Sequence, residues 1–384
     1  MDLARTWRAE FPILDTCTYL VSHSLGAMPA RARTYLEQFA NEWDHRGVRA
    51  WHEGWWETGR EIGNLLAPIL GVPAGTITLH QNATVAQSIV ASCLSFEGRR
   101  RKIVMQDLDF PTNHYLFEGF RRYGAQTVYV PSPDSIRAPI AKLVEAIDDE
   151  TALVPLSLVL FRSGCLQDVR PVVEKAHRVG ARVVLDVYQA AGTVPVNLEA
   201  LGVDFAVGGS VKWLCGGPGA GYLYVRKDLL DQLTPSIVGW AGHTAPFGFE
   251  TGGIRYAAGI ERFQSGTPNV PAWYAARAGY EIVGEIGVPA IRTRSLQLTG
   301  RLMHAASDRG WRLNTPAEDA ERGGSVVIDV PNGAAVTDEL LRRQIIVDYR
   351  PNAGIRVAPH FYTTDGDIDA AIEAMDSILA GVAR

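Results

Sequence analysis

The chain has 384 residues, of which 47% are hydrophobic and 21% are charged, and its formal net charge is −5 at pH 7. These totals predict a soluble globular protein with one large and one smaller hydrophobic core, and they argue against a nucleic-acid partner. No apolar run approaches the roughly 18 residues that a membrane-spanning helix needs, so no membrane partner is expected.

The four cysteines are widely spaced and form neither a C-x-x-C pair nor a zinc pattern. The first residues lack the apolar core of a signal peptide. We therefore expect reduced thiols, a cytoplasmic location and no metal site.

Between about residues 75 and 226, short apolar runs alternate with amphipathic helical patterns. The predicted strands are Thr76–His80, Ile103–Gln106, Thr127–Val130, Leu153–Leu160, Ala181–Asp186, Asp204–Val207 and Gly221–Val225. The predicted helices between them are Val85–Leu94, Thr112–Tyr123, Ile140–Ile147 and Val169–Val179. This alternation predicts an α/β fold with a mostly parallel, doubly wound sheet of seven strands.

After about residue 290 the pattern predicts a smaller α/β domain. Its predicted helices are Ala290–Asp308, Thr337–Arg343 and Asp365–Val382, the last with Thr364 as its N-cap. Its predicted strands are Trp311–Leu313, Ser325–Val330, Ile345–Tyr349 and Ile355–Val357. We predict a large domain of residues 16–265 and a small domain of residues 1–15 and 266–384.

Ligands of an open parallel sheet bind beyond the carboxyl ends of its strands. The strand ending at His80 is followed by a helix start that includes Ala83 and Thr84. Free backbone N–H groups there, with the Thr84 hydroxyl, form either a phosphate-binding site or a simple N-cap.

A carboxylate and an amine follow two later strands. Asp186 comes after the apolar strand Arg182–Leu185, where an unpaired carboxylate is costly, so it pairs with a side chain or with a ligand cation. Lys212 is the one lysine of five that follows a buried strand through small residues, and it is either a solvated loop lysine or a desolvated amine suited to a Schiff base. A phosphate site, an aspartate for a pyridine nitrogen and a lysine for an aldehyde, in this order, predict a pyridoxal 5′-phosphate (PLP) site.

Several short motifs occur in an order that is typical of one enzyme family. They are Tyr19-Leu20-Val21-Ser22-His23-Ser24-Leu25-Gly26, Trp51-His52-Glu53-Gly54-Trp55-Trp56, Phe110-Pro111-Thr112-Asn113, Phe161-Arg162-Ser163-Gly164, Gly239-Trp240-Ala241-Gly242-His243, Gly266-Thr267-Pro268 and Ile355-Arg356-Val357-Ala358-Pro359. With Asp186 and Lys212, they make the chain resemble the kynureninases, within the class V aminotransferase group of PLP-dependent enzymes. The resemblance implies the fold type I PLP-dependent transferase fold.

The resemblance also implies roles for individual residues. Lys212 and Asp186 would be catalytic, and His23, His52 and Arg356 would bind the substrate, with Arg356 gripping its carboxylate. The implied cofactor-binding residues are Ala83, Thr84, Phe110, Thr112, Asp186, Gln189, Ser210, Lys212, Trp240, Gly266 and Thr267. Gly266 and Thr267 would reach the phosphate in the partner subunit, which implies a homodimer with shared active sites.

The chain departs from the kynureninase pattern at three positions. It has Gln189 where kynureninases have a histidine, Val211 where they have a tyrosine, and His23 in place of an asparagine. Glutamine at the first position is familiar from cysteine desulfurases, where it donates a hydrogen bond to the cofactor's phenolic oxygen. However, a persulfide-forming desulfurase carries its cysteine on a loop in the second half of the chain, and no cysteine follows Cys215.

We therefore predict a PLP-dependent enzyme that cleaves a bond at Cβ of an α-amino acid, either C–C hydrolysis of the kynureninase kind or C–S β-elimination. The alternatives are an aminotransferase or oxidative deaminase on the same cofactor, and a non-catalytic binding protein of this fold. The aromatic residues Trp51, Trp55, Trp56, Trp240 and Phe247 either hold a bulky substrate side chain or pack in a dimer.

Overall fold

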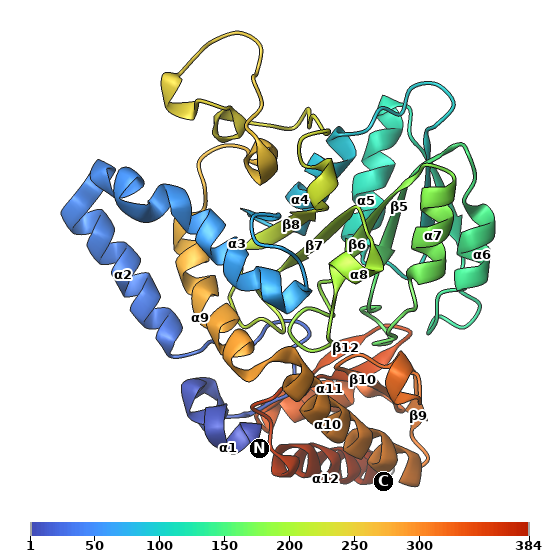
Figure 1. Ribbon diagram of the computed structural model, residues 1–384. Helices are drawn as coiled ribbons and strands as arrows, with labels where there is room; N and C mark the ends of the chain where they lie inside the picture. The colour runs from blue at the N-terminus through green and yellow to red at the C-terminus, as the bar shows by residue number, and fades with distance from the viewer. Residues whose placement is uncertain (1, 383–384) are drawn as a thin grey trace.

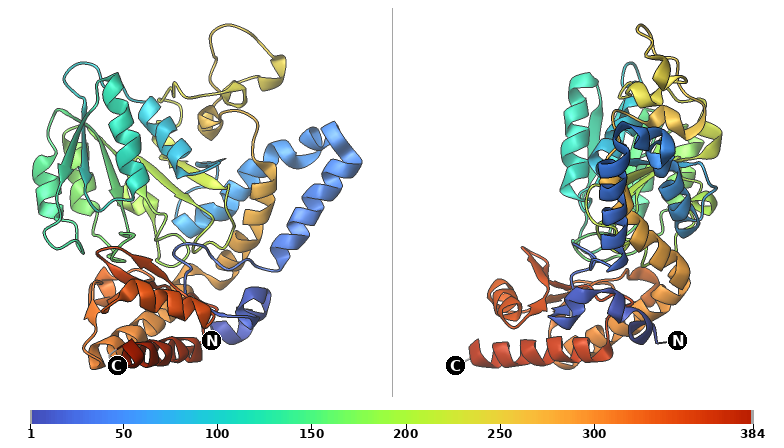
Figure 2. Two further views of the ribbon diagram at one scale, coloured as in Figure 1. Left: turned by 180° about the vertical axis from the view of Figure 1, so that it is seen from behind. Right: turned by 90° about the vertical axis from the view of Figure 1, so that its left-hand side faces the viewer.

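The computed structural model describes residues 2–382. A large part built on one central sheet lies above a smaller part built on a second sheet (Figures 1 and 2). Among residues 2–382, none of the helices combines the length and the apolar character needed to cross a bilayer.

The central sheet has seven strands in the order β2-β8-β7-β6-β5-β3-β4. Their bounds are β2 Ile77–His80, β3 Lys102–Gln106, β4 Gln126–Val130, β5 Thr151–Ser157, β6 Arg182–Asp186, β7 Phe205–Gly209 and β8 Gly221–Val225. Each matches a predicted strand, and the predicted fold class is confirmed. Strand β8 runs antiparallel to both of its neighbours, because the connection from β7, residues 210–220, is a loop without the crossover helix that parallel strands need.

Helices cover both faces of this sheet (Figure 1). The helices that contribute to the core on one face are α3 Trp56–Leu70, α6 Ile140–Ala146, α7 Arg170–Arg178 and α9 Val270–Ile286. On the other face lie α4 Ala83–Ser92 and α5 Pro111–Gly119, whose Ile89 and Phe117 are fully buried against the sheet. A further helix, α2 Arg31–Arg46, packs beside α9, and a single turn, α8 Leu198–Leu201, precedes β7. Because both faces are covered, the inner strands β7 and β8 are buried along their whole length.

The smaller part is a four-stranded antiparallel sheet in the order β12-β13-β10-β9 with three helices. The bounds are β9 Arg312–Leu313, β10 Val326–Asp329, β12 Asp348–Arg350, β13 Gly354–Val357, α10 Val288–Asp308, α11 Gly333–Arg342 and α12 Asp365–Val382. The run predicted as one strand, Ile345–Tyr349, is divided in two. Its first half, β11 Ile345–Ile346, pairs in parallel with β1 Thr18–Tyr19, and its second half belongs to β12.

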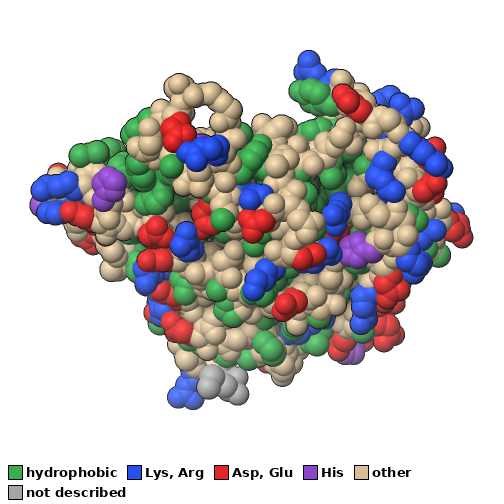
Figure 3. Space-filling model, turned by 45° about the horizontal axis from the view of Figure 1, so that its top comes forward, with side chains coloured by type: hydrophobic (Ala, Val, Ile, Leu, Met, Phe, Trp, Pro, Cys, Tyr) green, Lys and Arg blue, Asp and Glu red, His purple; other side chains and the backbone are tan. Residues whose placement is uncertain are grey.

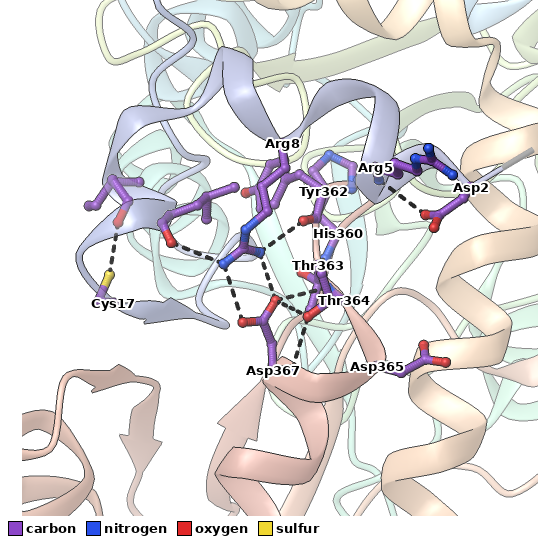
Figure 4. A network of polar contacts seen from close by, with 12 residues as sticks. Asp2, Arg5, Arg8, Cys17, His360, Tyr362, Thr363, Thr364, Asp365 and Asp367 are labelled. Atoms are coloured by element: carbon purple, nitrogen blue, oxygen red, sulfur yellow. Dashed lines mark hydrogen bonds and ion pairs between the residues drawn. The ribbon is translucent and has the colours of Figure 1, made fainter.

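The first residues of the chain are bound to the smaller part (Figure 4). After helix α1 Leu3–Trp7, the Arg8 guanidinium donates to the Asp367 carboxylate at 2.7 Å and to the Tyr362 carbonyl oxygen. Thr364 caps α12 as predicted, since its Oγ1 accepts from the Asp367 N–H at 3.1 Å. The domain limits predicted above stay a prediction.

Candidate active site

A cavity of about 240 Å³ lies where the ends of β3, β5 and β6 meet the start of α4 and the loop after β7. Seven predicted site residues line it: Ala83, Thr84, Phe110, Thr112, Asp186, Gln189 and Lys212. The sequence separates these residues by up to 129 positions, and the doubly wound sheet brings them to one edge.

One end of the cavity is the N-terminus of α4. Asn82 caps this helix, because its Oδ1 accepts from the Val85 N–H at 3.0 Å. The N–H groups of Ala83 and Thr84 precede the first intrahelical bonds, so both are available to a ligand. The helix dipole adds partial positive charge there, and this end of the cavity suits an anion such as a phosphate.

Lys212 enters the cavity from the loop after β7. That strand ends in Gly208 and Gly209, because two tyrosine hydroxyls leave no room for a side chain there. A Cβ on Gly208 would lie 2.2 Å from Tyr222 Oη, and a Cβ on Gly209 would lie 2.3 Å from Tyr188 Oη. The Lys212 Nζ lies 4.5 Å from the centroid of the Tyr188 ring and 5.6 Å from that of Phe110. Burial lowers the pKa of the Lys212 amine to about 8, against the opposing effect of Asp186. The amine is therefore more readily deprotonated than a solvated lysine.

Asp186 ends β6, the strand next to β7, and faces the same cavity. Burial raises the pKa of its carboxyl, while the Tyr188 N–H, bonded at 2.8 Å, and the Lys212 charge act to lower it. The Asn113 amide lies 3.5 Å from its other oxygen. The Asp186 oxygen that faces Asn113 has only this long hydrogen bond, so the carboxylate can still accept from a cationic ligand in the cavity.

The predicted carboxylate-binding arginine, Arg356, lies on β13 beside the cavity. Its Nη1 donates to the carbonyl oxygen of Phe161, a residue that lines the cavity, at 2.8 Å. Its Nε donates to Asp348 Oδ1 at 2.7 Å, and His23 Nε2 lies 3.1 Å from the same oxygen. Burial lowers the pKa of His23 to about 4, so the imidazole is neutral and donates this hydrogen bond. Arg350 also pairs with Asp348, at 3.0 Å.

Five other predicted site residues are not part of the cavity lining. The Ser210 hydroxyl is buried in contact with Ala220 O and Tyr280 Oη, both at 2.6 Å. His52 and Trp240 belong to an aromatic cluster with Trp56 and Phe247. The loop after β8, residues 226–258, includes two members of this cluster and projects at the top of Figure 1. Figure 3 shows apolar side chains gathered next to this loop. Gly266 and Thr267 line a separate small cavity.

The sequence argument missed six residues of the cavity lining: Asn82, Asn113, Ser157, Val159, Phe161 and Tyr188. Asn113 and Phe161 lie within motifs that carried the family resemblance, so position within those motifs was the available signal. Tyr188 follows Asp186 by two residues and lies against the Lys212 amine, and no local pattern indicated this contact.

Comparison with known proteins decides the family. Residues 19–363 match the family Aminotransferase class-V. This chain is a kynureninase-like member of that family. It is 32% identical to a kynureninase from Deinococcus radiodurans, over 97% of this chain and 92% of the relative, and 30% identical to a kynureninase from Pseudomonas fluorescens, over 97% and 91%. It is also 30% identical to an uncharacterized aminotransferase, YcbU, from Bacillus subtilis, over 97% of both chains.

Solved structures with the same fold include two enzymes of sulfur chemistry. The apo structure of a cysteine desulfurase from Thermococcus onnurineus aligns over 99% of both chains with a TM-score of 0.88 and 20% identity. A complex of the cystine C–S lyase C-DES with its product cysteine persulfide aligns over 95% of this chain and 98% of that one, with a TM-score of 0.85 and 22% identity. At these identities the likeness concerns the fold.

The kynureninase-like chain is therefore a PLP-dependent enzyme, and its cavity fits the cofactor. The helix start at Ala83 and Thr84 suits the phosphate, the Asp186 carboxylate suits the pyridine nitrogen, and the Lys212 amine, with its lowered pKa, suits the aldehyde. An anion site, a carboxylate and an amine of lowered pKa around one cavity are the three groups that this cofactor requires.

Proposed function

We propose that this enzyme cleaves a bond at Cβ of an α-amino acid, either a C–C bond as in kynurenine or a C–S bond as in a cysteine conjugate. The observation that carries the proposal is the convergence of Lys212 and Asp186 on one cavity that Arg356 borders. Its kynureninase relatives support the C–C variant. The cystine C–S lyase shares the fold and leaves the C–S variant open.

The residues divide the work between holding and proton transfer. PLP, when bound, supplies a ring that accepts the electrons released at the substrate's Cα. Asp186 would hold positive charge on the ring nitrogen, and the Lys212 amine, with its pKa lowered to about 8, would take the Cα proton. Arg356 would orient the substrate carboxylate, because two of its five N–H groups remain after the bonds to Asp348 and Phe161.

Product analysis tests this proposal. The purified holoenzyme is incubated with kynurenine, with cysteine conjugates and with alanine, while its absorbance spectrum and products are followed. Cleavage releases an acid, or a thiol together with ammonia, and Lys212→Ala abolishes it. Quantitative appearance of pyridoxamine phosphate without a cleaved side chain would contradict it.

Transamination or oxidative deamination is the second candidate. One relative carries the name aminotransferase. Transamination and oxidative deamination start with the same abstraction of the Cα proton as Cβ cleavage does. In transamination the proton is returned to the cofactor's aldehyde carbon, whereas in Cβ cleavage the bond to the Cβ substituent breaks instead. The same incubation separates them, since added 2-oxo acid restores the absorbance of an aminotransferase and leaves a lyase unchanged.

We also propose a homodimer whose subunits share their active sites. Gly266 and Thr267 lie outside the cavity of their own chain, which suits a role in the neighbouring one. Mixing the inactive variants Lys212→Ala and Thr267→Asp tests this. If the active sites are shared, each mixed dimer has one site with both native residues and regains activity. If the mixture stays inactive after subunit exchange, the shared-site proposal is wrong.

A further inference from the structure

The side chain of Gln189 lies between two buried groups of fixed polarity. Trp213 Nε1 donates to Gln189 Oε1 at 3.1 Å, and Gln189 Nε2 donates to the backbone oxygen of His23 at 3.1 Å. Trp213 and His23 are each 1% exposed and Gln189 is 8% exposed. The three residues come from segments after β7, after β6 and after β1, which only the tertiary structure brings together.

The polarity of the two neighbours decides how the amide is oriented. An indole N–H only donates and a backbone carbonyl only accepts, so the amide oxygen faces Trp213 and the amide nitrogen faces His23. A flipped amide would lose both hydrogen bonds and place two donors and two acceptors against each other. One of the two protons on Nε2 is used by His23, and no described residue accepts the second, while the Gln189 side chain lines the cavity.

Trp213 is itself held firmly. Its backbone oxygen accepts from His360 Nε2 at 2.8 Å, and the His360 ring lies edge-on to the indole at 5.4 Å. On another side, a Cβ added to Gly324 would lie 2.8 Å from the indole Cη2. The indole has little freedom to turn, so its N–H direction is fixed before a ligand binds.

We propose that Trp213 is a positioning residue that fixes the Gln189 amide so that a nitrogen proton, and never the oxygen, faces the ligand cavity. The inference rests on the proposed function: the resemblance to cysteine desulfurases implies the Gln189 donor, and what the structure adds is that Trp213 holds this donor in the required orientation. The residue next to the lysine in sequence thereby acts through a glutamine 24 positions earlier.

The test uses Trp213→Phe, which removes the indole N–H and keeps a buried ring. The dissociation constant for PLP should rise about three- to tenfold, as expected when one oriented hydrogen bond is lost. The pH midpoint of the visible absorbance change of the holoenzyme should move to higher pH, because a donor N–H stabilises a deprotonated oxygen. Gln189→Leu should move both quantities in the same direction.

Trp273→Phe is the matched control. Trp273 is 5% exposed, and its Nε1 has no hydrogen-bond partner in residues 2–382, so its loss removes a buried indole N–H without affecting Gln189. It should leave the PLP constant and the absorbance midpoint as in the wild type. The double variant Trp213→Phe/Gln189→Leu should be no weaker than Gln189→Leu alone, since Trp213 acts through Gln189.

Additive effects in the double variant, or a Trp213→Phe midpoint equal to that of Trp273→Phe, would overturn the proposal. If Trp213→Phe does not fold, the NMR chemical shift of the Trp213 indole N–H replaces it: a shift that is the same in the wild type and in Gln189→Leu also overturns the proposal. A wild-type protein that binds no PLP refutes the proposed function, while the chemical-shift measurement still tests the Trp213–Gln189 contact.

Discussion

His80, the last residue of β2, should make the stability of the protein depend on pH. It is 4% exposed, its Nε2 has no partner in the described chain, and burial lowers the pKa of its imidazole to about 4. In the unfolded chain the pKa is about 6.5. The pKa of His80 is lower in the folded than in the unfolded state. Above pH 6.5 the imidazole is neutral in both states and protonation does not affect the free energy of unfolding, which then falls as the pH falls from 6.5 towards 4.

The magnitude follows from proton uptake. At pH 5 the unfolded imidazole is almost fully protonated and the buried one almost fully neutral, so unfolding binds about 0.9 proton at this site. The corresponding slope of the free energy of unfolding is about 1.2 kcal/mol per pH unit, and about 3 kcal/mol is lost between pH 7 and pH 4.

A comparison with His80→Gln isolates this contribution. His23 and His360 have pKa values lowered to about 4 and act in the same direction, while Asp109, whose pKa burial raises to about 7, acts in the opposite one. All three are present in both proteins, so their effects cancel in the difference. Urea unfolding of the cofactor-free proteins between pH 7 and pH 4.5 should give an average slope that is flatter for His80→Gln by about 1 kcal/mol per pH unit. Equal slopes, or a His80 NMR resonance that titrates near pH 6.5, would refute the reasoning.

Three further predictions concern the site and its supporting strand. Borohydride reduction of the holoenzyme should attach PLP to the Lys212 peptide by mass spectrometry, and Lys212→Ala should lose both this label and turnover. Asp348→Asn removes the carboxylate that holds Arg356 and should raise KM for the amino acid about tenfold, with a smaller change in kcat and none in PLP affinity; a pure kcat effect would contradict this. Gly209→Ala places a Cβ 2.3 Å from a tyrosine hydroxyl and should lower the free energy of unfolding by about 1–3 kcal/mol. Gly300→Ala, in open space on α10, should raise it by up to about 1 kcal/mol. Thermal unfolding measures both variants, and equal shifts of the melting temperature would exclude the steric cause.

The local patterns of the sequence predicted the fold more completely than they predicted the residues of the site. All seven strands of the central sheet were found because each is a short apolar run bounded by polar or small residues. The strand predicted at Ile345–Tyr349 was divided because β1, more than 300 residues earlier, pairs with its first half. The hydrophobic periodicity of a five-residue segment does not depend on a pairing partner at such a distance, so it cannot predict that partner.

By itself, the sequence determined the order of strand, carboxylate and lysine that placed Asp186 and Lys212 at one sheet edge. This follows from connectivity, because parallel strands with crossover helices bring their carboxyl ends to the same side. Only the tertiary structure decided that His23 contacts Asp348 across 325 positions, that the Trp213 indole donates to Gln189, and that the Ser210 hydroxyl contacts a buried tyrosine. These contacts depend on how side chains from distant segments pack and satisfy one another's hydrogen bonds, and periodicity over a few residues contains no information on either.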